Sequence, residues 1–227
     1  MSVIQIAVAG NVASGKSTLS RAIANYFNWI IIPENAFGLT YLDELFKNPT
    51  EWAFEAQIAF FVEKVIEIHQ AVDKEINHIV DRCLYEDIDI YAKYFCLNGS
   101  ISPREQKILN WIKELGAYNT MSPTFLIYNK CNWEICAERS LHRNQYQDKI
   151  MNKKFIRDIG ELTQLWVENL CVKKTIPIFT IDSSNIDFRD KLIEKIILDD
   201  IKAILENITK LESNILNTEI LRIMQVK

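Results

Sequence analysis

The 227-residue chain has no apolar run that approaches the roughly 20 residues a membrane-spanning helix needs. It also has no excess of positive charge, because 26 Lys and Arg stand against 30 Asp and Glu, for a formal net charge of −4. Proteins that coat nucleic acid or bind anionic membranes need a basic surface. The composition therefore predicts neither nucleic acid nor membrane as a partner, and a polyanionic ligand would need a local group of cations.

The number and spacing of the cysteines argue against a zinc site and against a disulfide framework. The five cysteines lack paired CxxC spacing, and their odd number does not fit a disulfide framework. We expect reduced thiols in a cytoplasmic protein. The first residues lead directly into an apolar run, which argues against a signal or transit peptide. With 48% apolar residues and no low-complexity linker, the simplest organisation is one domain over residues 1–227, ending in a helical tail over residues 187–227 with a possible break around residues 212–217.

A complete phosphate-binding loop, G-x-x-x-x-G-K-S, stands between an apolar run and a helix-compatible stretch. Its backbone N–H groups would cradle phosphate oxygens, the lysine would add a charge at the β/γ-phosphates, and the following hydroxyl would bind Mg²⁺. The alternative is an ordinary strand-to-helix turn. The loop that we expect to hold ATP consists of Gly10, Asn11, Val12, Ala13, Ser14, Gly15, Lys16, Ser17 and Thr18.

Five short strand-like runs alternate with helical patterns, which predicts an α/β fold with a parallel sheet and helices on both faces. The runs span residues 3–9, 29–32, 78–80, 125–128 and 176–181. Ligands of such sheets bind beyond the carboxyl ends of the strands. Glu34, Asp81 and Arg82 follow the second and third runs, so we expect them at the site.

The residues at these strand ends separate the possible phosphate-loop chemistries. The guanine-binding NKxD pattern is absent, because Asn129 and Lys130 are not followed by its acid, so a GTPase is disfavoured. A hydroxyl acceptor benefits from a carboxylate base, whereas a nucleoside monophosphate needs cationic clamps. Glu34 therefore favours a hydroxyl acceptor, while Asp81 is placed to hold Mg²⁺ and Arg82 to stabilise developing charge.

Other polar residues have both a functional and a structural interpretation. Gln57 and Lys64 lie on one face of an apolar helix over residues 50–72, where either a ligand or a structural hydrogen bond would satisfy them. Asp87 and Tyr91 are four apart at the start of a helix, where a carboxylate is also favoured by the helix dipole. The four-residue spacing of Arg139 and Arg143 fits a lid over ATP phosphates or a solvated helix face.

Taken together, these motifs resemble the deoxyribonucleoside kinases, particularly the bacterial deoxyadenosine/deoxyguanosine kinases. The resemblance covers about residues 3–182 and rests on GNVASGKST, PE at 33–34, WAFEAQ at 52–57, DRCLYED at 81–87 and an arginine-containing segment. It implies a P-loop kinase fold with a five-stranded parallel sheet, a small helical lid at about residues 139–150, and usually a homodimer. It also implies ATP-dependent phosphorylation of the 5′-hydroxyl of a deoxynucleoside, with purines or cytosine favoured.

The resemblance also implies residue roles. Glu34 matches the general base, Arg82 the arginine near the 5′-oxygen, and Asp81 the position associated with magnesium. Gln57 matches the glutamine that reads the base edge, and Asp87 the aspartate that disfavours thymine. The remaining matches are Tyr91, which would stack on the base, the lid arginines Arg139 and Arg143, and Asp148, near an acid that holds the sugar 3′-hydroxyl.

Several positions depart from the family pattern. Phe46 replaces a tyrosine that contacts the sugar, and Lys64 replaces the arginine expected beside Asp87, which keeps the charge but loses the planar fork. Gln145 replaces another lid arginine, and Cys83 a serine. Two alternatives remain open: a nucleoside monophosphate kinase of the thymidylate kinase type, and a non-catalytic relative of the same fold with a structural or regulatory role.

Overall fold

The computed structural model describes residues 3–34, 42–119, 122–143, 151–173 and 176–225, and the side chains among them except at 117–119 and 211–225. Five parallel strands form one sheet in the order β2-β3-β1-β4-β5. The strands are β1 (Gln5–Gly10), β2 (Ile30–Ile32), β3 (His78–Asp81), β4 (Phe125–Lys130) and β5 (Ile178–Asp182). The predicted five-stranded parallel sheet is confirmed.

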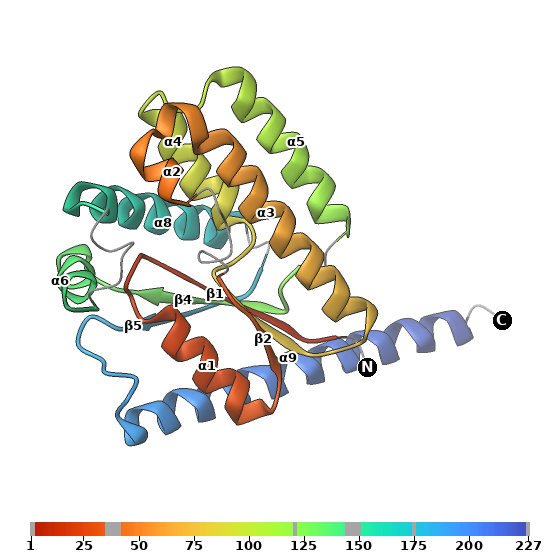
Figure 1. Cartoon of the computed structure of the whole chain (residues 1–227). Coiled ribbons are helices and arrows are strands. Elements are labelled where there is room, and N and C mark those ends of the chain that lie inside the picture. Colours follow the sequence, from red (N-terminus) through yellow and green to blue (C-terminus); the bar gives the residue numbers. More distant parts are fainter. Residues whose placement is uncertain (1–2, 35–41, 120–121, 144–150, 174–175, 226–227) are drawn as a thin grey trace. The chain divides into compact units, whose positions relative to one another are not determined.

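Helices cover both faces of this sheet (Figure 1). Helix α1 (Lys16–Phe27) packs on one face, and α3 (Pro49–Asp73) and α8 (Lys153–Lys173) lie on the other. Because both faces are covered, the central strands are apolar runs rather than alternating patterns, and every residue of β1 is buried.

The expected apolar helix over residues 50–72 is α3, which begins with Pro49 at its first turn. It buries Gln57 and Lys64 together with Phe60 and Phe61. Further helices pack against α3 and α8. They are α2 (Leu42–Lys47), α4 (Lys93–Leu97), α5 (Pro103–Asn119) and α6 (Trp133–Arg143).

The chain divides into two compact units, Met1–Ile186 and Asp187–Lys227. The second unit contains one helix, α9 (Lys191–Gln225). The expectation of a break around residues 212–217 is therefore wrong. That segment contains Ser and Asn, which are only weak helix formers, but neither Gly nor Pro, so nothing in it forces an end. Among the described residues, no helix combines the length and apolarity required to cross a bilayer.

Candidate active site

The phosphate loop joins β1 to α1 and has the backbone that its sequence predicts. Gly10 has φ 152°, and a Cβ there would lie 2.5 Å from the carbonyl oxygen of Asn129 on β4, so no side chain fits. Gly15, with φ 100°, caps the N-terminus of α1. The ammonium of Lys16 donates to the carbonyl oxygens of Gly10 and Asn11, at 3.0 and 2.9 Å. The loop thus presents a helix N-terminus and a buried cation, which is the arrangement that binds phosphate.

Neighbouring elements fix the loop in place. The Asn129 side chain donates to the Ser14 carbonyl oxygen at 2.9 Å, and the Ser183 hydroxyl donates to the same oxygen at 3.2 Å. Asn11 donates through its side-chain amide to the Ile156 carbonyl of α8 at 3.0 Å. These bonds join β1, β4, β5 and α8 around the loop, so its backbone donors are held in one arrangement.

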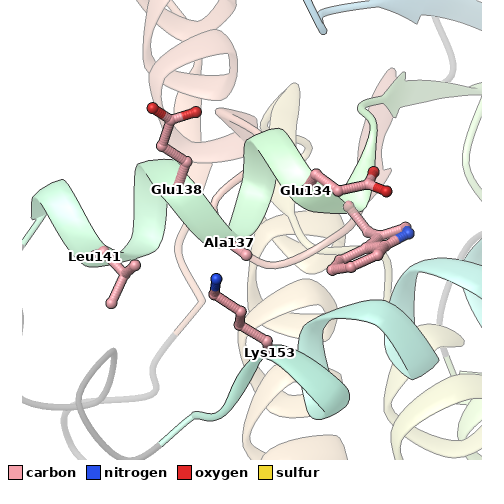
Figure 2. Close-up of a pocket in the computed structure, with 6 residues that line it drawn as sticks. Glu134, Ala137, Glu138, Leu141 and Lys153 are labelled. Atoms are coloured by element: carbon pink, nitrogen blue, oxygen red, sulfur yellow. The ribbon is translucent and has the colours of Figure 1, made fainter.

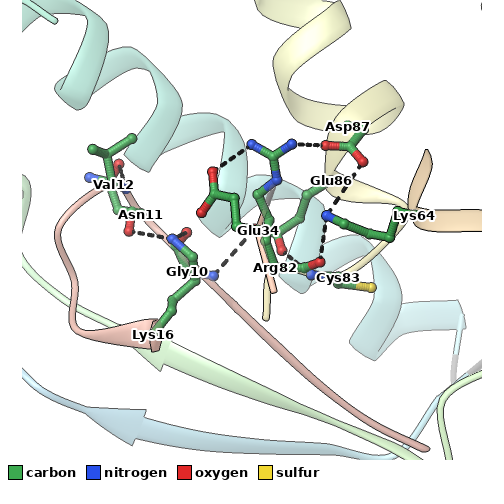
Figure 3. Close-up of polar contacts among 10 residues, drawn as sticks. All are labelled: Gly10, Asn11, Val12, Lys16, Glu34, Lys64, Arg82, Cys83, Glu86 and Asp87. Atoms are coloured by element: carbon green, nitrogen blue, oxygen red, sulfur yellow. Dashed lines mark hydrogen bonds and ion pairs between the residues drawn. The ribbon is translucent and has the colours of Figure 1, made fainter. Parts of the chain in front are cut away.

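A cluster of four charged side chains, Glu34, Lys64, Arg82 and Asp87, lies beside the loop (Figure 3). Arg82, directly after β3, donates to Glu34 Oε1 at 2.8 Å and, through its other terminal nitrogen, to Asp87 Oδ1. Lys64 Nζ lies 3.6 Å from Asp87 Oδ2 and donates to the Arg82 carbonyl oxygen at 3.0 Å. Asp87, Arg82 and Lys64 are buried, whereas the Glu34 side chain remains 28% exposed. Residues predicted from three separate motifs therefore meet at one place.

This cluster sets the charge state of Glu34. Burial alone would raise its pKa, but the nearby cations, Arg82 above all and then Lys16, Lys64 and Arg143, lower the pKa from 4.5 to about 2. For Arg82, burial would lower the pKa, but the negative charges of Asp87 and Glu34 outweigh this effect and raise it. Both groups are therefore charged throughout the neutral range, and Glu34 presents a carboxylate at the edge of the cluster.

Asp81 ends β3 next to the phosphate loop. It is 3% exposed, and burial followed by the charge of Glu34 raises its pKa, while a hydrogen bond from Ser17 acts in the opposite direction. Its Oδ1 is buried without a hydrogen-bond partner. An orphaned carboxylate oxygen beside a hydroxyl matches the oxygen ligands that Mg²⁺ takes when phosphates supply the rest. The residues present thus fit the ion, although the described residues contain no cluster of three or more His, Cys, Asp or Glu that could hold a metal by themselves.

Several polar and aromatic side chains that the sequence assigned to the site are buried or half-buried. Gln57 is 2% exposed and its Oε1 has no hydrogen-bond partner, which is costly unless a ligand supplies a donor. The Tyr91 ring lies under the Arg82 guanidinium, with 4.6 Å from Cζ to the ring centroid. Phe46 is half-buried, and its ring centroid lies 5.9 Å from that of Phe155. This is a setting for a flat, hydrogen-bonding ligand.

Asp87 and Tyr91 belong to a stretch of π-helix, η1 (Asp87–Ala92). The sequence predicted a helix here but not its wider turn, and such turns recur at functional sites. Asp89 anchors η1 to its neighbours, because one oxygen accepts from Lys113 of α5 at 2.6 Å and the other from Trp166 of α8 at 3.2 Å. The element that carries Asp87 is therefore held from two sides.

The predicted lid residues lie in different settings. Arg139 and Arg143 lie on α6, but the Arg139 guanidinium donates to the backbone carbonyl oxygens of Ser183, at 2.9 Å, and Ser14, at 3.4 Å. It braces the phosphate loop. Arg143, in contrast, is exposed and still contributes to the electrostatics of Glu34. Asp148, Gln145 and the rest of the expected lid beyond residue 143 lie outside the described residues.

A cavity of about 320 Å³ lies between α6 and the start of α8 (Figure 2). Its lining combines apolar and charged side chains, namely Trp133, Glu134, Ala137, Glu138, Leu141 and Lys153. None of the predicted site residues lines it. Glu34, Lys64 and Asp87 gather instead around Arg82, beside the phosphate loop.

Sequence reasoning missed one buried group in the site. Glu86 is fully buried and accepts hydrogen bonds from the backbone N–H groups of Gly10, at 3.3 Å, and Cys83, at 2.7 Å. A glutamate beside Asp87 in a helix-starting segment looks like a solvated charge, and only the fold brings Gly10 to it. No spacing in the sequence could have revealed this contact.

Comparisons with known proteins agree with this geometry. The model of the deoxynucleoside kinase family matches residues 6–206. A probable deoxycytidine kinase of fowlpox virus is 27% identical over 191 residues, which cover 82% of this chain and 81% of the viral protein. A deoxyadenosine/deoxycytidine kinase of Bacillus subtilis is 26% identical over 173 residues, covering 73% of this chain and 78% of that protein.

Solved structures show the same fold. A structure of deoxyadenosine kinase from M. mycoides with bound dATP superposes with a TM-score of 0.75 at 20% sequence identity, covering 88% of this chain and 100% of that chain. The family model matches most of the chain, and the phosphate loop, the carboxylate at Glu34 and the Asp81-Arg82 pair converge in space. The chain therefore belongs to the deoxynucleoside kinase family and is a phosphotransferase.

Proposed function

We propose that this protein transfers the γ-phosphoryl group of ATP to the 5′-hydroxyl of a purine deoxynucleoside or deoxycytidine, as a step of nucleotide salvage. The observation that carries the proposal is the 2.8 Å bond between Glu34 and Arg82, which lies beside the phosphate loop and continues to Asp87 through the other terminal nitrogen of Arg82. It supplies a carboxylate and a guanidinium where donor and acceptor would meet. Relatives named for deoxycytidine, deoxyadenosine and deoxyguanosine support this substrate class.

Glu34 acts as the base toward the 5′-hydroxyl. Its pKa, lowered to about 2, makes it a weak base, yet it is ionised at every neutral pH. Phosphoryl transfer passes through a loose transition state in most analyses, with little bond formation before the leaving oxygen departs. The hydroxyl proton can therefore leave late, when its oxygen has become acidic. Glu34 holds the hydroxyl in line by a hydrogen bond and then accepts the proton.

Cations on the other side of the reaction stabilise the charge of the moving group. Lys16 would bind the β/γ-phosphates, and Arg82 would bind the oxygens between donor and acceptor. The charge of Arg143 helps to lower the pKa of Glu34, which supports a role for this arginine in the same region. Arg139 holds the loop through Ser14.

Base selection follows from Gln57 and Asp87. The unpaired Gln57 Oε1 and its amide group can bind an acceptor–donor edge of a base with two hydrogen bonds. Asp87 accepts from the exocyclic amino group of adenine, guanine or cytosine, and it has no donor to offer the carbonyl oxygen of thymine. Tyr91 stacks on the base, with Lys64 fixing the Asp87 carboxylate. Asp148 is proposed to hold the sugar 3′-hydroxyl.

Magnesium would be held by Ser17 and Asp81, directly or through water. The unpaired Asp81 Oδ1 and its hydrogen bond from Ser17 support this assignment. When bound, the ion would neutralise phosphate charge and fix the phosphate chain for in-line attack.

We also propose that the protein acts in the cytoplasm as a homodimer, with no nucleic acid or membrane partner. The support is the acidic composition and five free cysteines, together with the dimeric habit of the family it resembles. Residues 1–227 would form one functional domain, with residues 139–150 as its lid and residues 187–227 as a helical tail. Sedimentation of the purified chain would give the oligomeric state.

A radiolabelled-ATP assay against the four deoxynucleosides and dTMP tests the activity. We expect label on deoxyadenosine, deoxyguanosine or deoxycytidine. Label on dTMP alone would establish a thymidylate kinase type of enzyme, and no label on any acceptor would indicate a non-catalytic relative. Either result would overturn the proposal.

A further inference from the structure

Glu86 joins two parts of the site that the sequence places far apart. It precedes η1, and its side chain is 0% exposed. Oε1 accepts from the N–H of Gly10, the first residue of the phosphate loop, at 3.3 Å, and Oε2 accepts from the N–H of Cys83 at 2.7 Å. Figure 3 shows the carboxylate between the loop and the turn that carries Arg82. One side chain therefore bonds both to the loop proposed to hold the phosphoryl donor and to the turn proposed to face the acceptor.

The turn that Glu86 holds is strained. Arg82 has φ 68°, a left-handed conformation that non-glycine residues rarely adopt. Three bonds surround that residue: its N–H donates to the Val8 carbonyl oxygen at 3.1 Å, its carbonyl oxygen accepts from Lys64, and the next N–H, that of Cys83, donates to Glu86. Strain persists only where neighbours over-determine the conformation, so these bonds fix the direction of the Arg82 side chain.

We infer that Glu86 is a positioning residue that sets the separation between the phosphate loop and the Arg82 turn, and hence between phosphoryl donor and acceptor. For catalysis the inference rests on the proposed function. A carboxylate suits this place because both of its oxygens accept, and each faces a backbone donor. A glutamine of the same length would turn an NH₂ group toward one of the two N–H groups and lose that bond.

Opposing influences act on the pKa of Glu86. Burial outweighs the lowering effects of Lys16, Arg82, the Gly10 N–H and Lys64, so the pKa is raised from 4.5 to about 7. Cys83, Asp87, Tyr91 and Tyr128 are the other titratable groups that interact with it or lie in the same cluster. A proton on either oxygen would oppose a backbone donor, as the NH₂ group of glutamine does. We therefore expect turnover to depend on the ionisation of this group near neutral pH.

The test compares Glu86→Gln with Glu105→Gln. Glu105, at the start of α5, also accepts from a backbone N–H, that of Ser102, but at the surface and outside the site. Turnover, KM for ATP and nucleoside, and thermal unfolding are measured for both variants from pH 6 to 8. Amide hydrogen exchange is followed for the segments that contain Gly10 and Cys83.

For Glu86→Gln we expect kcat to fall about tenfold to a hundredfold, since small misplacements of reacting groups have effects of this size, while both KM values change less than about threefold. The rise of wild-type kcat between pH 6 and 8 should flatten. Exchange should accelerate at Gly10, Cys83 or both. Glu105→Gln should leave these quantities unchanged.

Two results would overturn the inference: unchanged exchange at both segments, or a kcat within twofold of that of Glu105→Gln in a folded variant. If the wild-type protein phosphorylates no deoxynucleoside, the proposed function fails by itself. The exchange measurement needs no substrate, so it then still decides whether Glu86 holds the two turns together.

Discussion

Replacing Glu34 by glutamine removes the proposed base while keeping the length of the side chain and one acceptor oxygen. A positioned general base contributes about 10²–10⁴-fold to rate, and the lower limit corresponds to about 2.7 kcal/mol of barrier. Glu34 has a depressed pKa and is a weak base, so we expect the lower limit, a fall in kcat of about 10²-fold. KM for the nucleoside should change little, because the amide oxygen still accepts from the hydroxyl.

The same substitution breaks the Glu34–Arg82 ion pair, so its effect on stability has to be separated from its effect on rate. The lowering of the pKa from 4.5 to about 2 corresponds to a net stabilisation of the carboxylate of about 3 kcal/mol, after burial has opposed the surrounding cations. Because the side chain is 28% exposed, solvent reduces this to about 1–2 kcal/mol. Denaturant unfolding measures that loss directly.

The assay follows initial rates with deoxyadenosine and deoxycytidine at saturating ATP. Glu55→Gln is the matched control, since Glu55 is an exposed glutamate on α3 and its replacement removes the same charge. A folded Glu34→Gln enzyme that turns over within about threefold of the control would refute the assignment of Glu34 as the base.

Four further outcomes are expected. Asp87→Ala should lower the preference for purine deoxynucleosides over thymidine by about tenfold, because a buried charge-assisted contact is lost; an unchanged ratio of kcat/KM values would count against its role. Phe46→Tyr should restore a hydroxyl near the sugar and improve discrimination against 2′,3′-dideoxynucleosides, which competition kinetics would detect or exclude. Asp81→Asn should raise the Mg²⁺ concentration for half-maximal rate by about tenfold or more, and an unaltered magnesium titration would remove Asp81 from the site. As its folded-state pKa is depressed, Glu34 should contribute stability above pH 4.5 that disappears as the pH falls toward 2; acid unfolding curves of wild-type and Glu34→Gln should converge in that window, and parallel curves would contradict the ion pair.

Much of the fold could be predicted because its signals are local. The strand-like runs and the 50–72 helix were found to within a few residues, since covered parallel strands and a buried helix leave continuous apolar patterns. The continuity of α9 could not be judged, because Ser and Asn within residues 212–217 weaken a helix without ending it.

The candidate site was predictable wherever a residue follows a strand, as Glu34 and Arg82 do, since strand ends share one edge of the sheet. Contacts between residues that are far apart in the sequence could not be predicted. Glu86 reaches a glycine 76 positions away. Arg139 turned toward backbone carbonyls rather than into open space, because the loop after β5 offers it several acceptors.

The left-handed backbone at Arg82 limits how the enzyme can change. Glycine would relax that conformation but would delete the guanidinium, so the backbone strain cannot be relieved there without losing the role proposed for Arg82. Glu75, in the turn after α3, has a similar φ of 55°. A glycine at Glu75 would therefore relieve strain without touching the proposed site, whereas a glycine at Arg82 would not.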